Sequence, residues 1–481
     1  MKRKANKINK QFCILFFCLF VSYKLRSSPD ITIAIHLYGV IESSISIIPL
    51  SGTNAFKPII ELSSIKNGAI TTINIPETFL PSEFVLRYDY KEKEASNSYP
   101  SEQHIFISSQ NLELWVNPSY LHNSDSTHFQ RGEKENEIFA SFTKENIIKK
   151  EKLSVLQDFL MKYDVTKSDL YQQCIIEYEK RRSIYNKWVT EQAYNNKEYF
   201  VSNIFQFHVV PEMNWNGSEA DRVQSLIYHY FDGIDFENPL ILKTAELNKW
   251  MNSYVNIYGE LSTTQKIRDS LFTLAGKTAI KQAQKGNPKV YGWMVDYFFN
   301  GYETNGISEG IKMLDTFMND PNCQTAKKQS IEKRLNGIKT LKHGTITPDF
   351  QFKDSTGKIV NFHEFKTVSK YKLVLFWSAD CGHCKELVNS LYPWYEQLSD
   401  KKLVSVFALS IDNTETEIQN WNNAISQLPT WIHHRCEGGV NSKEANDYFI
   451  LSTPTMILVD SKTNKIISLP ENIQDLERKI H

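Results

Sequence analysis

The chain has 481 residues, which is too long for a single hydrophobic core, so we expect several domains. Lys plus Arg and Asp plus Glu number 55 each, and this balance gives no support to nucleic acid or an anionic surface as a partner. Aromatic residues are plentiful at 12%, while Gly and Pro number 19 and 16, which favours packed globular domains over disorder.

Residues 1–28 have the pattern of an export signal. Five Lys and Arg residues stand between positions 2 and 10, an apolar run follows over residues 12–21, and no acidic residue occurs before Asp30. The run is shorter than the about 20 apolar residues of a membrane-spanning helix, so we predict a signal peptide and a location in the periplasm or cell envelope. No two small residues separated by one position follow the run as a cleavage site, which leaves an uncleaved N-terminal anchor as the alternative.

Residues 30–118 alternate apolar and polar side chains as strands do. Ile31, Ile33, Ile35 and Leu37 would share one face of the first strand, and turn-rich segments separate it from later ones. We predict a β-rich domain, a small β-sandwich or open barrel. It holds no cysteine and no concentrated group of titratable residues, so we assign it no chemistry.

Residues 126–343 change to a helical period. Ser218 has the side chain of an N-cap, and the apolar residues after it follow the i, i+3, i+4, i+7, i+8 spacing of one buried stripe. These residues are Val223, Leu226, Ile227, Tyr230 and Phe231. We predict an all-α domain whose aromatic residues form the core.

The chain has seven cysteines, and removal of a signal peptide would take Cys13 and Cys18 with it. Five then remain, an odd and scattered set that does not make a disulfide scaffold even where disulfides persist. They are Cys174, Cys323, Cys381, Cys384 and Cys436. Helical spacing favours a buried apolar role for Cys174, Cys323 lies in a loop, and Cys436 is either a third redox thiol or, as we favour, a loop residue.

Residues 345–481 alternate strands with helices. We expect a strand pair over residues 346–362, a buried strand over 371–377, a helix to 398, a strand over 403–411, a helix over 415–428, a strand over 456–460 with a hairpin partner over 465–469, and a terminal helix. This order predicts an α/β domain with a sheet covered on both faces.

Cys381, Gly382, His383 and Cys384 stand between the buried strand and the next helix. At a helix N-terminus the unpaired N–H groups and the dipole favour a thiolate, and a protonated His383 would add positive charge, so Cys381 is the predicted nucleophile. Cys384 lies one turn further on and can resolve a mixed disulfide. The spacing therefore predicts a dithiol that exchanges with disulfides.

Two other uses of this pair stay open on spacing alone. A metal site needs two more ligands, and the nearest are His433, His434 and Cys436, about fifty residues later and without the paired spacing of structural zinc sites, so we expect no metal. An inert disulfide has little use for a position that activates a thiolate.

Several segments around the pair resemble the thioredoxin fold, specifically the bacterial envelope thiol-disulfide oxidoreductases (TlpA/ResA-like) that include reductases of cytochrome c maturation. The matching segments are Pro348-Asp349-Phe350, the strand ending in Phe376-Trp377, Cys381 to Cys384, and Ser452-Thr453-Pro454-Thr455 before a strand ending in Asp460. The resemblance covers residues 345–481.

The resemblance implies a thiol-disulfide oxidoreductase without a cofactor, whose partners are disulfide-bearing envelope proteins and a membrane-bound thiol electron donor. It also implies that the peptide before Pro454 is cis, and that Thr453 and Pro454, with Trp377 nearby, bind a substrate peptide beside the dithiol. The β-rich and helical regions resemble N-terminal extensions of uncharacterised type.

The chain departs from the family pattern in its charged residues. Leu375 stands where thioredoxin has a buried carboxylate, and Leu387 where envelope reductases often have glutamate. Glu386 is one position earlier, a rotation of about 100° that would turn it to solvent. Asp380 replaces the usual tryptophan before Cys381, where it either opposes a thiolate or caps the helix and faces away, which we favour.

Two features of the sequence favour opposite directions of electron flow. Cys-Gly-His-Cys matches protein disulfide isomerase, whose potential is roughly 90 mV above thioredoxin's, whereas the envelope family favours a reductase. We predict a reductase or general oxidoreductase rather than an oxidase or isomerase. Val374 occupies the proline position of the peroxiredoxin pattern, which argues against a peroxidase, and a partner-binding protein with a redox-passive domain is the non-enzymatic alternative.

Overall fold

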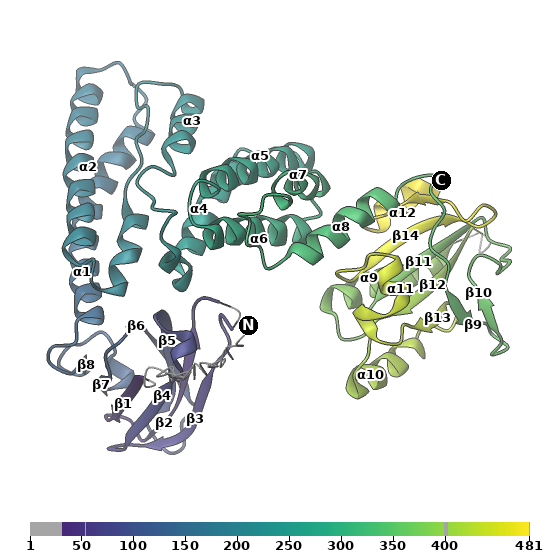
Figure 1. Ribbon diagram of the computed structural model, residues 1–481, viewed down its shortest axis with the longest axis horizontal. Helices are drawn as coiled ribbons and strands as arrows, with labels where there is room; N and C mark the ends of the chain where they lie inside the picture. Colours follow the sequence, from purple (N-terminus) through teal and green to yellow (C-terminus); the bar gives the residue numbers. More distant parts are fainter. Residues whose placement is uncertain (1–30, 53, 399–402, 481) are drawn as a thin grey trace, which may run out of the picture. The chain divides into compact units, whose positions relative to one another are not determined.

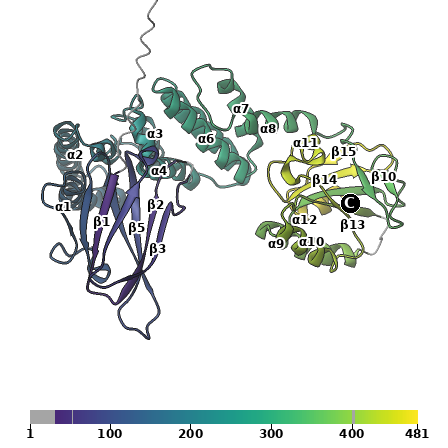
Figure 2. The same cartoon turned by 60° about the horizontal axis from the view of Figure 1, so that its bottom comes forward.

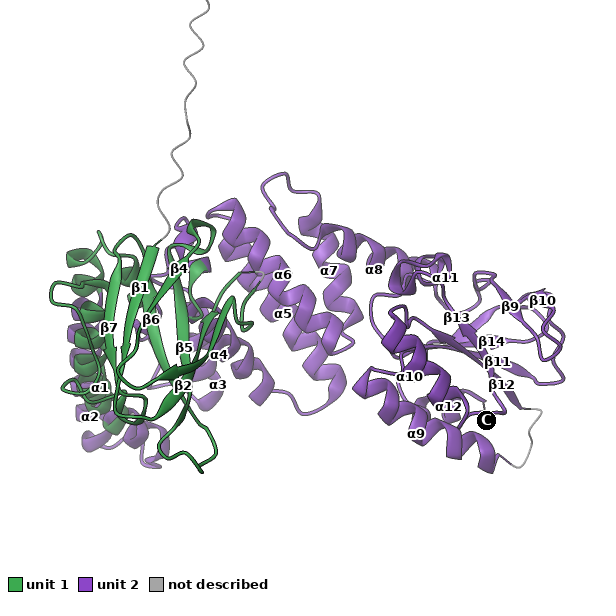
Figure 3. Cartoon of the chain, turned by 90° about the horizontal axis from the view of Figure 1, so that it is seen from below, with its two compact units in different colours: residues 1–155, 190–205, 243–245 green, residues 156–189, 206–242, 246–481 purple. Residues whose placement is uncertain are grey.

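The computed structural model describes residues 31–52, 54–398 and 403–480, which form two compact units (Figure 3). The first unit comprises the described part of residues 1–155 with 190–205 and 243–245, and the second holds the rest. The predicted signal or anchor over residues 1–28 lies outside the described residues, and the predicted domain limits stay predictions. None of the helices in the described ranges is long and apolar enough to cross a membrane.

The first unit contains two four-stranded sheets, in the orders β4-β1-β7-β8 and β3-β2-β5-β6 (Figure 2). The strands are β1 (Ile31–Leu37), β2 (Glu42–Pro49), β3 (Ile60–Lys66), β4 (Ile70–Ile75), β5 (Ser82–Lys91), β6 (Tyr99–Ile107), β7 (Leu112–Val116) and β8 (His128–Phe129). Ile33 and Ile35 of one sheet share a core with Ile45 and Leu86 of the other. The sheets therefore bury their apolar faces against each other, which confirms the predicted β-sandwich-like architecture.

Helices follow from residue 135 (Figure 1). They are α1 (Glu135–Lys162), α2 (Asp169–Asn195), α3 (Glu219–His229), α4 (Glu246–Glu260), α5 (Gln265–Ala283), α6 (Pro288–Thr304), α7 (Ser308–Met318) and α8 (Lys328–Thr340), with 3₁₀ turns at Phe200–His208 and Pro239–Lys243. Ser218 is the N-cap of α3, as predicted, and it also forms a capping box with Asp221. Tyr230 and Phe231 are buried just beyond the end of α3 and join the aromatic core of the second unit.

The C-terminal α/β domain is built on a five-stranded sheet in the order β13-β12-β11-β14-β15. The strands are β11 (Tyr371–Trp377), β12 (Val404–Ser410), β13 (Ile432–Arg435), β14 (Thr455–Asp460) and β15 (Ile466–Ser468), and a hairpin of β9 (Gln351–Lys353) and β10 (Ile359–Asn361) precedes them. β12 runs parallel to β11 and to β13, whereas β14 is antiparallel to β11.

Every residue of β11 is buried because the sheet is covered on both faces, as predicted. Helices α9 (Gly382–Gln397), α10 (Glu415–Ile425) and α12 (Ile473–Ile480) cover one face, where Leu373 and Leu375 pack (Figure 2). The hairpin and α11 (Lys443–Asp447) cover the other face, where Val374 and Phe376 pack.

Helix α8 joins the helical core of the second unit to the α/β domain. Ile331 and Leu335 pack in the helical core, whereas Leu341, just after α8, packs in the α/β core beside the hairpin. Leu451 of the α/β domain in turn packs against the helical core. The chain segment that leads to Thr453 is therefore supported by both cores.

Gly276 of α5 lies where the helical core is packed too tightly for a larger side chain. A Cβ atom there would lie 1.9 Å from Tyr302 Oη, and Tyr302 cannot move freely because its hydroxyl donates to Phe272 O at 2.9 Å. We expect Gly276→Ala to lower the free energy of unfolding by about 1–3 kcal/mol in urea denaturation. Gly301→Ala in α6 is the matched control, since a Cβ there meets nothing within 4 Å, and it should leave stability unchanged or raise it by up to ~1 kcal/mol. Equal effects of the two substitutions would contradict this packing.

Candidate functional site

Cys381 is the N-cap residue of α9, directly after the loop that follows β11. Its Sγ accepts a hydrogen bond from the backbone N–H of Cys384 at 3.2 Å. A sulfur in this position faces the unpaired N–H groups and the positive end of the helix dipole, both of which stabilise a thiolate. Cys381 is partly exposed, so the residue at the helix N-terminus is accessible from solvent.

Cys384 lies one turn further into α9 and is fully buried. Burial, reinforced by the neighbouring Cys381, raises the pKa of the Cys384 thiol to about 12. Both cysteines are free in the structure, so this is the dithiol form. The two cysteines thus differ in access, since Cys381 is partly exposed and Cys384 is buried.

The loop before β14 lies against the dithiol. The Thr453–Pro454 peptide is cis, as the resemblance implied. Cys381 Sγ lies 3.5 Å from the carbonyl oxygen of Thr453, seventy-two residues away in the sequence. The fold therefore brings together the two predicted segments, the Cys-Gly-His-Cys turn and the proline loop, at one end of the sheet.

His383 and Glu386 point to solvent on the first turns of α9. Their side chains are 88% and 81% exposed, and His383 Nδ1 lies 3.7 Å from Glu386 Oε2. Gly382 is also exposed, and a Cβ there would meet nothing within 4 Å. The side chain of Glu386 therefore faces solvent, as its one-position shift from the glutamate of the envelope reductases predicted.

Asp380 does not cap α9, because Cys381 itself is the N-cap. Its carboxylate instead accepts two hydrogen bonds from the side-chain amide of Asn420, in α10, at 2.8 and 3.0 Å. The prediction that Asp380 caps α9 was wrong. Its carboxylate binds a residue of another helix. Asp380 thus links the dithiol turn to α10.

Trp377 is only 2% exposed, at the end of β11. Its predicted contact with a substrate is therefore wrong for this structure, because the neighbouring side chains of the core cover the indole ring. Trp377 instead packs in the same core as Cys384, four positions before the first cysteine of the pair.

Asp412 is a buried carboxylate beneath the dithiol turn that the sequence analysis missed. It is 1% exposed and accepts hydrogen bonds from the hydroxyl groups of Ser378 at 2.5 Å and Ser410 at 2.7 Å. It also accepts from the backbone N–H of Ala379, at 3.0 and 3.2 Å to its two oxygens. Ser378 Oγ in turn accepts from the N–H of Asp380 at 3.2 Å, so one carboxylate orders the segment that leads into Cys381.

A signal for Asp412 was present in the sequence. Ser410-Ile411-Asp412 ends the strand after the one that leads to the dithiol, and parallel neighbours place their carboxyl ends at the same edge of a sheet. Asp412 could therefore have been predicted by searching for an acidic residue at the end of the neighbouring strand, rather than among the residues next to the cysteines in sequence.

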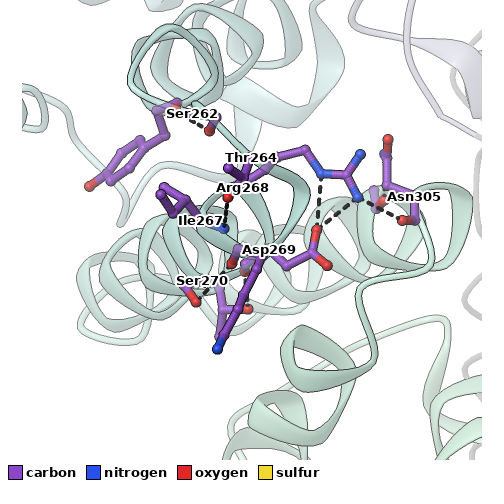
Figure 4. A network of polar contacts seen from close by, with 11 residues as sticks. Ser262, Thr264, Ile267, Arg268, Asp269, Ser270 and Asn305 are labelled. Atoms are coloured by element: carbon purple, nitrogen blue, oxygen red, sulfur yellow. Dashed lines mark hydrogen bonds and ion pairs between the residues drawn. The ribbon is translucent and has the colours of Figure 1, made fainter.

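A cavity of about 1170 Å³ opens beside the dithiol within the second unit. His383, Thr453 and Pro454 line one wall, and polar residues of the helical region, including Arg268 and Asn305, line another. Arg268 is held in place, since its guanidinium donates to Asp269 Oδ1 at 2.7 and 2.9 Å and to Asn305 O at 3.3 Å (Figure 4). Thr453, which contacts Cys381, is thus also part of the wall of a cavity that polar side chains line.

Three further cysteines lie within the described residues, and all three are free thiols. Cys436 packs in the core on the opposite face of the sheet from Cys384, so the two cannot share a four-ligand metal site across β11 and β12. Cys436 lies in the loop directly after β13, where we favoured a loop residue, and its side chain is fully buried. Burial raises the pKa of that thiol to about 12. Cys174 is half-buried, and burial raises the pKa of its thiol, in keeping with the apolar role predicted for it.

Asp412 yields a prediction for the reactivity of Cys381. We expect Asp412→Asn to loosen the turn, lowering stability by about 2 kcal/mol and the rate of alkylation of Cys381 by about tenfold at neutral pH. Asp460→Asn is the matched control, because Asp460 also accepts several hydrogen bonds, from Lys462 and Thr463, but at the other end of β14. If both variants lose stability and neither lowers the rate of alkylation of Cys381 at neutral pH, Asp412 has only a structural role.

Comparison with known proteins agrees with this fold. Residues 369–466 match the family model described as thioredoxin-like. Among solved structures, a thioredoxin-like protein from Bacteroides caccae is 17% identical over 55% of this chain and 94% of its own, with a TM-score of 0.37.

Two further solved structures are similar to part of this chain. The thioredoxin domain of a thiol-disulfide oxidoreductase from Bacteroides vulgatus is 28% identical, over 29% of this chain and 96% of its own, with a TM-score of 0.25. A thiol:disulfide interchange protein from Bacteroides sp. is 26% identical, over 29% and 89%, with a TM-score of 0.25. No curated protein matches the chain. The family match and the five-stranded sheet together show that the C-terminal domain of this chain is thioredoxin-like.

Proposed function

We propose that the chain is an exported thiol-disulfide oxidoreductase that reduces or exchanges disulfides in envelope proteins. The observation that carries the proposal is the setting of Cys381 Sγ, which accepts from the Cys384 N–H at 3.2 Å and lies 3.5 Å from the Thr453 carbonyl. A partly exposed sulfur at a helix N-terminus, next to a buried second thiol, has the arrangement that disulfide exchange needs.

The reaction we propose has two steps. The Cys381 thiolate attacks one sulfur of a substrate disulfide, forming a mixed disulfide and releasing the other substrate sulfur as a thiolate. Cys384 then loses its proton and attacks Cys381 Sγ, which forms the Cys381–Cys384 disulfide and releases the second substrate thiol. The substrate gains two electrons and two protons, and the dithiol loses them.

The difference in burial between Cys381 and Cys384 determines which of them attacks first. Because burial holds the pKa of Cys384 at about 12, this residue remains a thiol at neutral pH and does not compete with Cys381 for the substrate. Its proton must leave during the second step, and Glu386 faces solvent and cannot take it directly. The substrate thiolate released in the first step is a base already at the site.

The proline loop and the cavity beside it favour a polypeptide substrate. The Thr453 carbonyl is an acceptor at the position where an extended chain would pair, and the cavity of about 1170 Å³ continues from it along polar walls. Sulfur carries the electrons, so the reaction needs no cofactor. A reductase consumes its dithiol in each turnover, and we therefore propose a membrane-bound thiol electron donor as the second partner.

Trapping of the mixed disulfide tests the proposal. In Cys384→Ser the second step cannot occur, so we expect envelope proteins to accumulate in covalent complexes with the chain, visible on non-reducing gels and dissolved by dithiothreitol. Cys381→Ser is the matched control and should trap nothing, because it lacks the attacking sulfur.

Two outcomes would contradict the proposal. Absence of complexes with Cys384→Ser would favour the alternative of a partner-binding protein with a redox-passive domain. Complexes of equal amount in Cys323→Ser, which keeps the dithiol and removes a half-buried thiol elsewhere, would show that the trapping does not report on this site.

A further inference from the structure

Three metal-binding side chains meet at the edge of the α/β domain, apart from the dithiol. They are His434, Cys436 and Glu444, whose ligand atoms all lie within 4.8 Å of one another. This spread is somewhat wider than the separation of ligands around one small cation, so modest rotamer changes would close it. It is the one such group of three or more His, Cys, Asp or Glu residues in the described ranges.

The local backbone explains how the three meet. His434 belongs to β13 and Cys436 follows two positions later, so their side chains leave the extended chain on the same side. Gly438 and Gly439 then adopt positive φ values of 95° and 62° and turn the chain back. The turn is packed, since a Cβ at Gly439 would lie 2.8 Å from the carbonyl oxygen of Ile411, and it returns α11 with Glu444 over the end of the strand.

Burial gives the cluster an inner thiol and two outer ligands. Cys436 is fully buried, whereas the side chains of His434 and Glu444 keep 21% and 19% exposure. His434 Nε2 lies 3.5 Å from Glu444 Oε1, but this buried nitrogen makes no hydrogen bond among the described residues. The ion pair with Glu444 thus leaves this buried nitrogen without a hydrogen bond to any described residue, and a cation between the three groups would bind it.

The donor set identifies the class of ion. Imidazole nitrogen, thiolate sulfur and carboxylate oxygen are the three ligand types that proteins use for zinc, whereas a thiolate disfavours magnesium and calcium. Three protein ligands leave one tetrahedral position for water, on the partly exposed side of His434 and Glu444. Binding would release the proton of the Cys436 thiol, since a coordinating cysteine is a thiolate.

The cluster is separate from the proposed redox site. Cys436 packs with Phe350 and Phe407 on one face of the sheet, whereas Cys384 packs with Leu391 on the other. An ion held here would tie the edge strand β13 to α11 without touching the dithiol. Its expected effect is therefore on the stability of the domain.

We propose that His434, Cys436 and Glu444 bind one zinc ion in a site that is independent of the Cys381–Cys384 pair. This site needs neither the proposed oxidoreductase activity nor a substrate, so either proposal can fail without the other.

The experiment uses the full chain with Cys381→Ser and Cys384→Ser, because a reduced dithiol can itself hold zinc. After incubation with zinc and gel filtration, we expect about one zinc per chain and a raised melting temperature. With cobalt in place of zinc, we expect a thiolate-to-cobalt charge-transfer band and the visible bands of a tetrahedral ion. Cys436→Ser in the same background should abolish the charge-transfer band and weaken zinc binding by at least about 100-fold.

Two further variants keep the result decisive. Cys323→Ser is the matched control, because it removes another thiol of the second unit and should keep both the zinc and the cobalt band. Glu444→Gln alters a partly exposed ligand, so its fold should persist even if Cys436→Ser unfolds, and we expect at least about tenfold weaker zinc binding. The proposal is overturned if the parent variant retains no zinc, or if Glu444→Gln binds zinc as tightly as the parent does.

Discussion

The hydrogen bond from the Cys384 N–H to Cys381 Sγ is the interaction on which the rest of the site depends. It exists because α9 begins at Cys381, so the sulfur takes the place that an oxygen of serine or aspartate takes at other helix starts. A sulfur at this position interacts with the helix dipole most favourably when it carries negative charge. The same helix turn buries Cys384, so one local geometry creates an exposed sulfur and a protected one.

The helix start is held from three directions within the α/β domain. β11 is buried along its whole length and fixes the residues before the turn. Asp412, from the end of β12, binds Ser378 and Ala379 of the turn itself. The Thr453 carbonyl approaches from the loop before β14. The site is thus assembled from three adjacent strand ends, and each of these strands packs in both cores of the domain.

The features that the sequence predicted are those encoded in local patterns. Cys381 and Cys384 at a strand-to-helix junction and the alternation of strands with helices follow from neighbours in the chain. The cis peptide before Pro454 was expected only from the resemblance to the thioredoxin fold. The features that it missed depend on contacts between distant residues. Asp380 was interpreted from its place before Cys381, but Asn420 of another helix binds it, and Trp377 was assigned to substrate although the core covers it. The meeting of Glu444 with His434 and Cys436 depends on a two-glycine turn, whose direction the spacing alone does not give.

A redox titration of the full chain tests the central claim, that Cys381 and Cys384 cycle as one dithiol, most directly. The chain would be equilibrated in glutathione or dithiothreitol buffers, quenched by alkylation, and the peptide that holds both cysteines quantified by mass spectrometry. The account predicts a single two-electron transition at a potential between about −270 mV, that of thioredoxin, and about −180 mV, that of protein disulfide isomerase. A pair that alkylates to the same extent in every buffer, with no transition between dithiol and disulfide, would contradict it.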